Sequence, residues 1–514
     1  MRVRERVVSL TDAELAEVMR PREVTLVEIE ESPGVFVSGG GMAQTYRRVV
    51  TVESSESGRH RVRQRVEVES HIPFWGFLFG NALASHLGRV GPNTKAPFWF
   101  PPDFVDEEAT ATLARICTLA FVVGYCIVLL SQIITYAAEE FGADKGAQGI
   151  ALATVRVDVF LALPLTLLAD RHGRRRLVVT GTVVALCLTA VGSLAPNLFA
   201  LTGAQVAARG VANAVVVTLG VMVAEEMPAG ARAWATSLLT IAGVTGAGIC
   251  LFALPIADAA PGAWRVLFLI PLLFIPLARA TGRHLKETRR YTVSAETRTH
   301  KPNPWKVLRD HRGRFILLAS SGLLFALFGT PASQFQNEFL RNNRGFSGAE
   351  ISLFVVLTAL PGGIGIVVGG RLAERGRRLV GAVAMFAGTA ATALMFYSSG
   401  VGLYAWSAVG SLIGAAAIPA LAVYGAELFP TEARNAANGG IGLASRIGSV
   451  IGLVLVGQLS DRIGIPRSLL YVSAGPLLVC VLILAFYPET AHRELEDLNP
   501  EDRPPPALPP LPFG

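Results

Sequence analysis

Two short stretches decide how this chain folds. Residues 224–232 read AEEMPAGAR and residues 426–434 read AELFPTEAR, so the pattern A-E-x-x-P-x-x-A-R occurs twice, 202 positions apart. A second pair keeps the same spacing, because Glu287-Thr288 matches Glu489-Thr490. Self-similarity at a fixed offset is the signature of a repeated structural unit. We therefore expect two copies of one unit that run in the same direction.

The composition indicates that both units are embedded in a membrane. Of the 514 residues 51% are hydrophobic and 17% are charged, against about 25% charged in an average soluble domain. A helix that crosses a bilayer needs about 20 apolar residues. Twelve segments meet this need: 113–136, 147–169, 177–195, 198–222, 234–256, 264–280, 315–334, 350–370, 379–398, 401–424, 439–459 and 468–487. We expect an all-α membrane protein of twelve transmembrane helices in two six-helix halves.

The rest of the chain divides around these halves. Residues 1–110 predict a small α+β appendage, with a helix that starts at a Thr11/Glu14 capping box and a hairpin of two valine-rich strands, 46–53 and 61–69. Residues 72–86 either lie at the membrane interface or close a small core. The expected divisions are 1–110 for the appendage and linker, 111–280 and 315–490 for the halves, 281–314 for a basic central loop, and 491–514 for a proline-rich tail.

Basic residues indicate the orientation of the chain in the membrane and the kind of partner that it contacts. Eleven Lys or Arg residues lie from Arg279 to Arg314, and further arginines follow the second and eighth segments. By the positive-inside rule, both termini and the basic loops are cytoplasmic in a multi-pass protein of the cell membrane. The net charge of +7 therefore faces anionic lipid, and we expect no nucleic-acid partner. We also expect a monomer.

The sequence offers no pattern for an enzyme or a metal centre. Its five cysteines lie in apolar segments without a C-x-x-C pair, and its histidines lie outside these segments. A P-loop, which would bind ATP, is absent from the sequence. We expect no catalytic residues, no bound metal and no cofactor.

Four motifs resemble those of the major facilitator superfamily. Residues 166–175 read TLLADRHGRR, 370–378 read GRLAERGRR, 427–439 read ELFPTEARNAANG, and 488–490 read PET. The last two are similar to the sugar-porter and organic-ion or metabolite–proton symporter branch. The resemblance implies a secondary transporter that moves a small organic solute by alternating access, driven by a proton gradient.

Charged residues at the cytoplasmic helix ends predict a gate between the halves. Acidic and basic side chains there can bond to the partner half and bias an equilibrium between two states. Asp170-Arg171 and Glu374-Arg375 occupy matching positions, 204 residues apart. The proposed gate residues are Asp170, Arg171, Gly173, Arg174, Glu225, Arg232, Glu374, Arg375, Glu427 and Arg434.

Four ionisable residues lie inside the apolar segments: Arg156, Asp158, Arg209 and Arg446. Such residues are costly in a membrane and are functional candidates by default. Arg156 and Asp158 are two positions apart, about 200° around a helix, so they should face different ways, with Arg156 at the seam and Asp158 toward its own bundle.

The family resemblance adds that Arg446 stands where organic-anion transporters carry an arginine on helix eleven. We therefore expect an anionic solute, with Arg446 and Arg156 as its counter-charges and Arg209 as a further candidate. Asp158 is the expected proton carrier, paired with Arg209 or Arg156. A structural ion pair is the alternative for each of the four residues.

Polar side chains on helices one and seven complete the candidate binding set: Tyr125, Gln132 and Gln334. Such residues also serve as contacts between helices. Two other functions stay open at this point. One is a proton-driven drug exporter, and the other is a sensor or fusion protein whose activity resides in residues 1–110.

Overall fold

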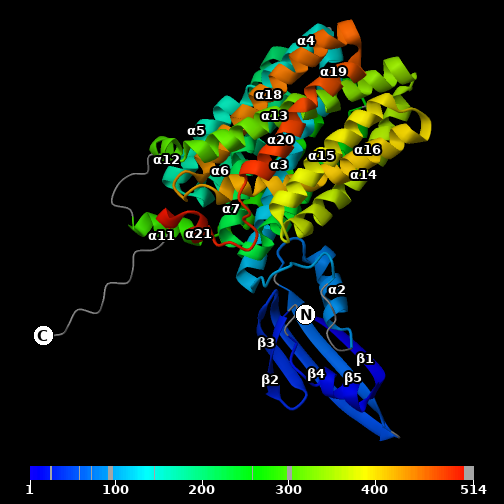
Figure 1. Ribbon diagram of the computed structural model, residues 1–514, viewed down its shortest axis with the longest axis vertical. Helices are drawn as coiled ribbons and strands as arrows, with labels where there is room; N and C mark the ends of the chain where they lie inside the picture. Colours follow the sequence, from blue (N-terminus) through cyan, green and yellow to red (C-terminus); the bar gives the residue numbers. More distant parts are fainter. Residues whose placement is uncertain are drawn as a thin grey trace, which may run out of the picture. The chain divides into compact units, whose positions relative to one another are not determined.

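The computed structural model describes residues 1–22, 26–56, 58–70, 72–90, 97–143, 145–257, 259–297 and 304–502. Most of the predicted proline-rich tail, residues 503–514, therefore lies outside the described residues. The chain forms two compact units, Met1–Thr118 and Leu119–Gly514. Figure 1 shows a sheet in the first unit and a bundle of helices in the second.

The first unit contains a five-stranded antiparallel sheet with the order β1-β5-β4-β3-β2. Its strands are β1 (Arg2–Thr11), β2 (Leu26–Ser32), β3 (Val35–Gly41), β4 (Ala43–Glu56) and β5 (Arg59–Ser70). The expected hairpin is confirmed as β4 and β5, and Val62, Val66 and Val68 point into the core as their alternation predicts. The other three strands were not predicted.

Two helices accompany the sheet. Helix α1 (Asp12–Val18) begins at the predicted capping box, since Thr11 and Glu14 bond to each other's backbone amides. Helix α2 (Gly76–Leu87) packs Leu83, Ala84 and Leu87 against sheet residues such as Val66. Residues 72–86 therefore help to close a small core, which was one of the two alternatives for them.

Twelve helical stretches of the described residues are long and apolar enough to cross a membrane, as predicted. They are Glu107–Glu140, Ile150–His172, Arg174–Leu194, Leu198–Glu226, Ala229–Ile256 and Trp264–His284 in the first half, and Arg312–Arg344, Leu353–Ala373, Arg377–Tyr397, Gly400–Glu427, Arg434–Ile463 and Ile465–Phe486 in the second. Each overlaps one apolar segment of the sequence.

Several of these stretches consist of two helices. The second is α4 (Lys145–Val155) followed by α5 (Asp158–His172), with a turn at Arg156 and Val157. The sixth is α9 (Trp264–Leu273) and α10 (Ile275–His284), and the twelfth is α19 (Ile465–Val472) and α20 (Ala474–Phe486).

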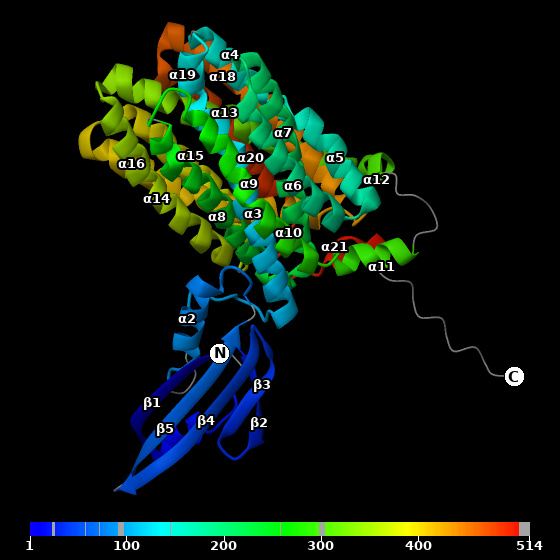
Figure 2. The same ribbon diagram turned by 180° about the vertical axis from the view of Figure 1, so that it is seen from behind.

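The remaining long helices are continuous or nearly so. They are α3 (Glu107–Glu140), α6 (Arg174–Val191), α7 (Leu198–Glu226), α8 (Arg232–Ala253), α13 (Arg312–Arg344), α14 (Gly348–Ala373), α15 (Arg377–Tyr397), α16 (Gly400–Ala422) with α17 (Tyr424–Glu427), and α18 (Arg434–Ile463). The predicted central loop contains α11 (Arg289–Thr297) and α12 (Pro304–Asp310). Figure 2 shows α6 and α7 of the first half toward the viewer.

Equivalent helices pack alike in the two halves. A Cβ atom on Gly246 of α8 would lie 1.8 Å from the carbonyl oxygen of Phe121 of α3. A Cβ atom on Gly452 of α18 would lie 2.4 Å from the carbonyl oxygen of Leu327 of α13. Only glycine permits such close helix contacts, so the duplication seen in the sequence is also a duplication of packing.

The halves meet through two equivalent pairs of helices. Helix α5 of the first half contacts α18 of the second, and α8 of the first half contacts α14 of the second. Both pairs carry residues of the predicted gate at their ends.

Candidate functional site

A buried network of ion pairs, the first clasp, joins the two halves at one end of the bundle. The Arg174 guanidinium donates to the Glu225 carboxylate at 3.1 Å and to the carbonyl of Thr431 at 2.5 Å. The same Glu225 oxygen accepts a hydrogen bond of 2.9 Å from Arg434. Thr431 and Arg434 belong to the second half, and all three charged side chains are fully buried. Because water is excluded, these charged bonds are stronger than pairs on a surface, and breaking one leaves a buried charge.

Asp170 joins the first clasp through backbone amides of the other half. Its carboxylate accepts from the Ala436 amide at 2.9 Å, and from the backbone and side-chain N–H groups of Asn435 at 3.3 and 2.9 Å. These residues form the first turn of α18, where the amides have no partner within the helix and carry partial positive charge. An acidic residue of the first half therefore caps a helix of the second.

The second clasp repeats this arrangement with the halves exchanged. Arg377 donates to the Glu427 carboxylate and, at 3.1 Å, to the carbonyl of Ala229. Glu427 also accepts from Arg232 of the first half at 3.4 Å. The contacts that Arg174 and Arg434 make across the halves in the first clasp thus have counterparts here in Arg377 and Arg232.

Glu374 occupies the place that Asp170 has in the first clasp. Its carboxylate accepts from the amides of Ala233 and Trp234, at 2.5 and 3.2 Å, at the start of α8. Burial raises the pKa of the Glu374 carboxyl above its ordinary value, against the opposite effect of Arg377.

Two of the predicted gate residues lie outside the clasps. Arg171 and Arg375 are both exposed, whereas Arg174 and Arg377 are fully buried. The structure therefore corrects the sequence prediction by placing Arg377, and not Arg375, in the second clasp. The signal for Arg377 was present, because it follows Gly376 as Arg174 follows Gly173, but the second copy of the motif is one residue shorter.

Two glutamates that sequence reasoning did not assign to the site hold the clasp arginines in place. Glu287 accepts from the first two backbone amides of α6, at 3.1 and 3.2 Å, and Glu489 does the same for α15 at 3.1 and 3.2 Å. Gly173, at the start of α6, has a φ of +100°, and a Cβ atom there would lie 2.4 Å from a Glu287 oxygen. The repeated Glu-Thr pairs in the sequence were the available signal.

The segment that follows the last transmembrane helix bonds to both clasps. Asp502 accepts from Arg434 at 2.6 Å, and Glu494 forms an ion pair with Arg232 at 3.2 Å. Asn499 donates to the carbonyl of Glu427 at 2.7 Å. This strap, residues 491–502, therefore reinforces the closure of that end of the bundle, a role that the sequence did not indicate.

The four ionisable residues inside the bundle form one central charge cluster. Asp158 is fully buried and accepts from Arg209 at 3.3 Å and from Asn213 at 2.9 Å. Arg446, from the second half, lies 4.0 Å from the same carboxylate. Two guanidinium groups, one from each half, thus pair with one carboxylate, and the charge of Arg156 acts on both Asp158 and Arg446.

Both hydrogen bonds of Asp158 come from α7 of its own half, as expected, and the structure adds Arg446 of the other half at 4.0 Å. That expectation assumed a continuous helix, but α4 ends at Val155 and α5 begins at Asp158. The turn interrupts the regular helical spacing between Arg156 and Asp158, and the charges of the two residues act on each other. Of the two expected partners of Asp158, Arg209 forms an ion pair with it.

The three polar candidates occupy different environments. Tyr125 is buried among apolar side chains, and its hydroxyl donates to the carbonyl of Leu267 at 2.9 Å, which is a contact between helices. Gln132 is partly exposed and Gln334 is exposed. Gln336, two residues beyond Gln334, lines the cavity described next.

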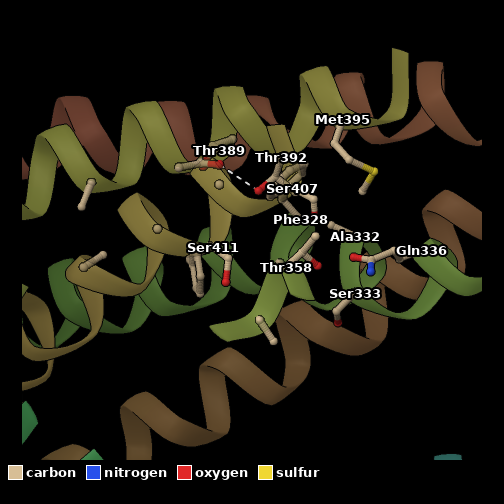
Figure 3. A pocket seen from close by; sticks show the side chains of 18 of the residues that line it. Phe328, Ala332, Ser333, Gln336, Thr358, Thr389, Thr392, Met395, Ser407 and Ser411 are labelled. Carbon is tan, nitrogen blue, oxygen red and sulfur yellow. Dashed lines mark hydrogen bonds between the residues drawn. The ribbon is translucent and has the colours of Figure 1, made fainter. Parts of the chain in front are cut away.

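A cavity of about 440 Å³ lies among α13, α14, α15 and α16, and we call it the second-half cavity. Its apolar lining includes Phe325, Phe328 and Met395. Among the described lining residues none is ionisable, and eight carry hydroxyl or amide groups. These are Ser333, Gln336, Asn337, Thr358, Thr389, Thr392, Ser407 and Ser411. Figure 3 shows the labelled polar side chains gathered around one space.

Comparison with known proteins identifies the fold. The family model of the Major Facilitator Superfamily matches residues 116–339 and 332–512, one match for each half. The chain belongs to the major facilitator superfamily. Members of this superfamily are multi-pass membrane transporters of small molecules.

Two of the similar proteins are sugar transporters. It is 25% identical to the glucose transporter GlcP of Staphylococcus epidermidis over 432 residues, which cover 74% of this chain and 94% of the relative. A solved structure of the proton:xylose symporter XylE, bound to 6-bromo-6-deoxy-D-glucose, matches with a TM-score of 0.64 and 16% identity over 77% of this chain and 99% of the symporter.

A structure from a different functional class has a similar fold. The human organic anion transporter MFSD10 matches with a TM-score of 0.60 and 14% identity over 72% of this chain and 98% of that protein. At this identity the likeness concerns the fold alone. The chain is thus a secondary transporter of the major facilitator superfamily, and its own residues must indicate the solute.

Proposed function

We propose that this protein is a proton-coupled transporter that moves a small anionic organic solute across the cell membrane by alternating access. The observation that carries the proposal is the central charge cluster, in which Arg209 and Arg446 pair with the single carboxylate of Asp158 and the charge of Arg156 acts on the same groups. Counted by their formal charges, the three arginines and one aspartate have an excess of two positive charges. A carboxylate-bearing solute would neutralise part of that excess, whereas a neutral solute would not.

The position of the cluster supports alternating access. Asp158 and Arg209 belong to the first half and Arg446 to the second, so a solute held by them contacts both halves. Transporters of this architecture bind their solutes near the midplane between two halves that rock against each other. In the proposal, the clasps close the cytoplasmic side, and their rupture opens the site to the cytoplasm.

Asp158 is the proposed proton carrier, because it is the acidic group of the cluster. Protonation would remove its charge and weaken its pairing with Arg209 and Arg446, freeing both arginines for an anionic solute. No cofactor takes part in the proposal, and the proton gradient supplies the driving force.

The test is uptake by purified protein in liposomes with an imposed pH gradient. Arg446→Gln should lower the apparent affinity for a carboxylate solute by about ten- to a hundredfold, because a hydrogen bond between charged groups is lost. Arg446→Lys should restore part of the affinity, and Arg467→Gln, an exposed arginine, serves as the matched control.

Uptake of a neutral sugar is the second candidate, favoured by the likeness to GlcP and XylE. This function would be established if the protein takes up a neutral sugar but no carboxylate, and if Arg446→Gln leaves the affinity for the sugar unchanged. Proton-driven export of drugs from the same liposomes would instead indicate a drug exporter.

A further inference from the structure

The second-half cavity and the central charge cluster differ in chemistry. The cluster carries excess positive charge, whereas the described walls of the cavity offer hydroxyl and amide groups together with the rings of Phe325 and Phe328. Hydroxyl and amide groups can both donate and accept hydrogen bonds, so they match a ligand whose groups also do both. Ligand hydroxyls have this property.

A contact between two helices links the second-half cavity to the helix that carries Arg446 of the central charge cluster. Thr330 of α13 and Ser449 of α18 form a hydrogen bond of 2.9 Å between their hydroxyls. Gly329 and Ser333, within one turn of Thr330, line the cavity. Arg446 lies three residues before Ser449, which is about 5 Å along the helix. The helix that carries Arg446 is therefore bonded to the helix that forms one wall of the cavity.

We infer that the solute is a polyhydroxylated carboxylate, a sugar-acid-like molecule whose carboxylate meets the arginines and whose hydroxyl groups occupy the second-half cavity. The inference rests on the proposed function, because it takes the central charge cluster as the anion site. A hydrocarbon acid would make no hydrogen bonds to the polar groups of the cavity, and a neutral sugar would not neutralise the excess positive charge of the cluster.

The experiment compares three six-carbon probes on the purified full-length protein by calorimetry. Gluconate carries both features, hexanoate carries the charge alone, and sorbitol carries the hydroxyls alone. Gluconate should bind at least about tenfold more tightly than either other probe, because each hydrogen-bonded contact changes affinity by about three- to tenfold.

Two variants assign the hydroxyl contacts to the cavity. Thr392→Val and Ser407→Ala remove one hydroxyl each, and each should weaken gluconate binding by about three- to tenfold while hexanoate binding stays unchanged. Thr245→Val is the matched control, because Thr245 makes the same bond within its own helix as Thr392 but is exposed on α8.

The outcomes separate this inference from the proposed function. Equal binding of hexanoate and gluconate, with no effect of the cavity variants, would overturn the polyhydroxylated solute and leave the anion site standing. Sorbitol binding as tight as that of gluconate, unaffected by Arg446→Gln, would overturn the anion site itself. Absence of binding of all three probes to folded protein would overturn the inference.

Discussion

Arg434 of the second half donates a 2.9 Å hydrogen bond to Glu225 of the first half, and both side chains are completely buried. Glu225 also holds Arg174 of its own half. One carboxylate thus forms ion pairs with an arginine from each half. The state in which the clasps are closed depends on this shared contact, because separating the halves would leave buried charges without partners.

Neutralising Arg434 should open the clasp end of the bundle. In Arg434→Gln, Glu225 and Asp502 lose a charged donor, and a buried pair broken on one side typically costs about 3–5 kcal/mol. The closed state should become a minor population. Spin-label distances between the halves, measured across the clasp end, would report the shift.

The equivalent change in the second clasp, Arg232→Gln, should act in the same direction, because Arg232 pairs with Glu427 and Glu494. Arg176→Gln, which alters an exposed arginine, is the control. Unchanged distance distributions in both clasp variants would contradict the assignment of the clasps as a gate.

Gly173→Ala should destabilise the first clasp without removing a charge. The φ of +100° is strained for alanine, and the new Cβ atom would collide with the Glu287 carboxylate. We expect a loss of about 1–3 kcal/mol in thermal unfolding of the purified protein. Gly313→Ala on α13 is the matched control, because a Cβ atom there meets no neighbour within 4 Å. Equal melting temperatures for the two variants would argue against strain at position 173.

Asp158→Asn should abolish the pH dependence of transport while the protein stays folded. The amide cannot exchange a proton, and it weakens the pairing with Arg209 and Arg446. Counterflow, which needs no net driving force, should continue in the variant, whereas accumulation driven by a pH gradient should cease. Asp461→Asn, at the exposed end of α18, is the control. Wild-type accumulation by the Asp158 variant would exclude this residue as the proton carrier.

Asp502→Asn should loosen the strap and weaken the first clasp. Asp502 accepts from Arg434 and from the backbone amide of Thr431, and a bond to a charged group contributes about 1.5–3 kcal/mol. Hydrogen exchange at the start of α18 should become faster. The exposed Glu501→Gln serves for comparison, and protection that is identical in both variants would mean that the strap does not reinforce the closure.

The first unit should lose stability in mild acid through His86. Burial, together with Arg89 and Arg22, lowers the pKa of His86 below its ordinary 6.5. The unfolded state therefore binds the proton more readily, so stability is full above pH 6.5 and falls as the pH drops through the lower folded value. Hydrogen exchange of β5 and α2 should accelerate over that range. His86→Gln should flatten this dependence, and a slope that persists would point to another group.

The helical spans followed from the sequence because hydropathy and repetition are properties of the chain itself. The apolar runs predicted all twelve spans, and the repeated A-E-x-x-P-x-x-A-R pattern predicted two equivalent halves. The sheet was predicted less well. Only β4 and β5 were recognised, since their valines alternate clearly, whereas glycines interrupt the alternation in β3.

The candidate site was harder to predict because its contacts depend on local breaks. Asp158 could not be placed by helical geometry, since the turn at Arg156 and Val157 interrupts the helix. In the second copy of the clasp motif, one missing residue hid the equivalence of Arg377 and Arg174. Gln336 rather than Gln334 lines the cavity, because a shift of two residues turns a side chain by about 200°.

By itself the sequence determined which residues enter the membrane, where the chain repeats, and which charges have to be paired. The tertiary structure alone decided which charges meet: Glu225 with Arg434, Glu427 with Arg232, and Asp158 with arginines of both halves. Hydropathy and helical periodicity are properties of consecutive residues, so they can be recognised without knowing how the helices pack. Pairing is set by the direction of a side chain after every turn and break, and that direction emerges only when the helices pack.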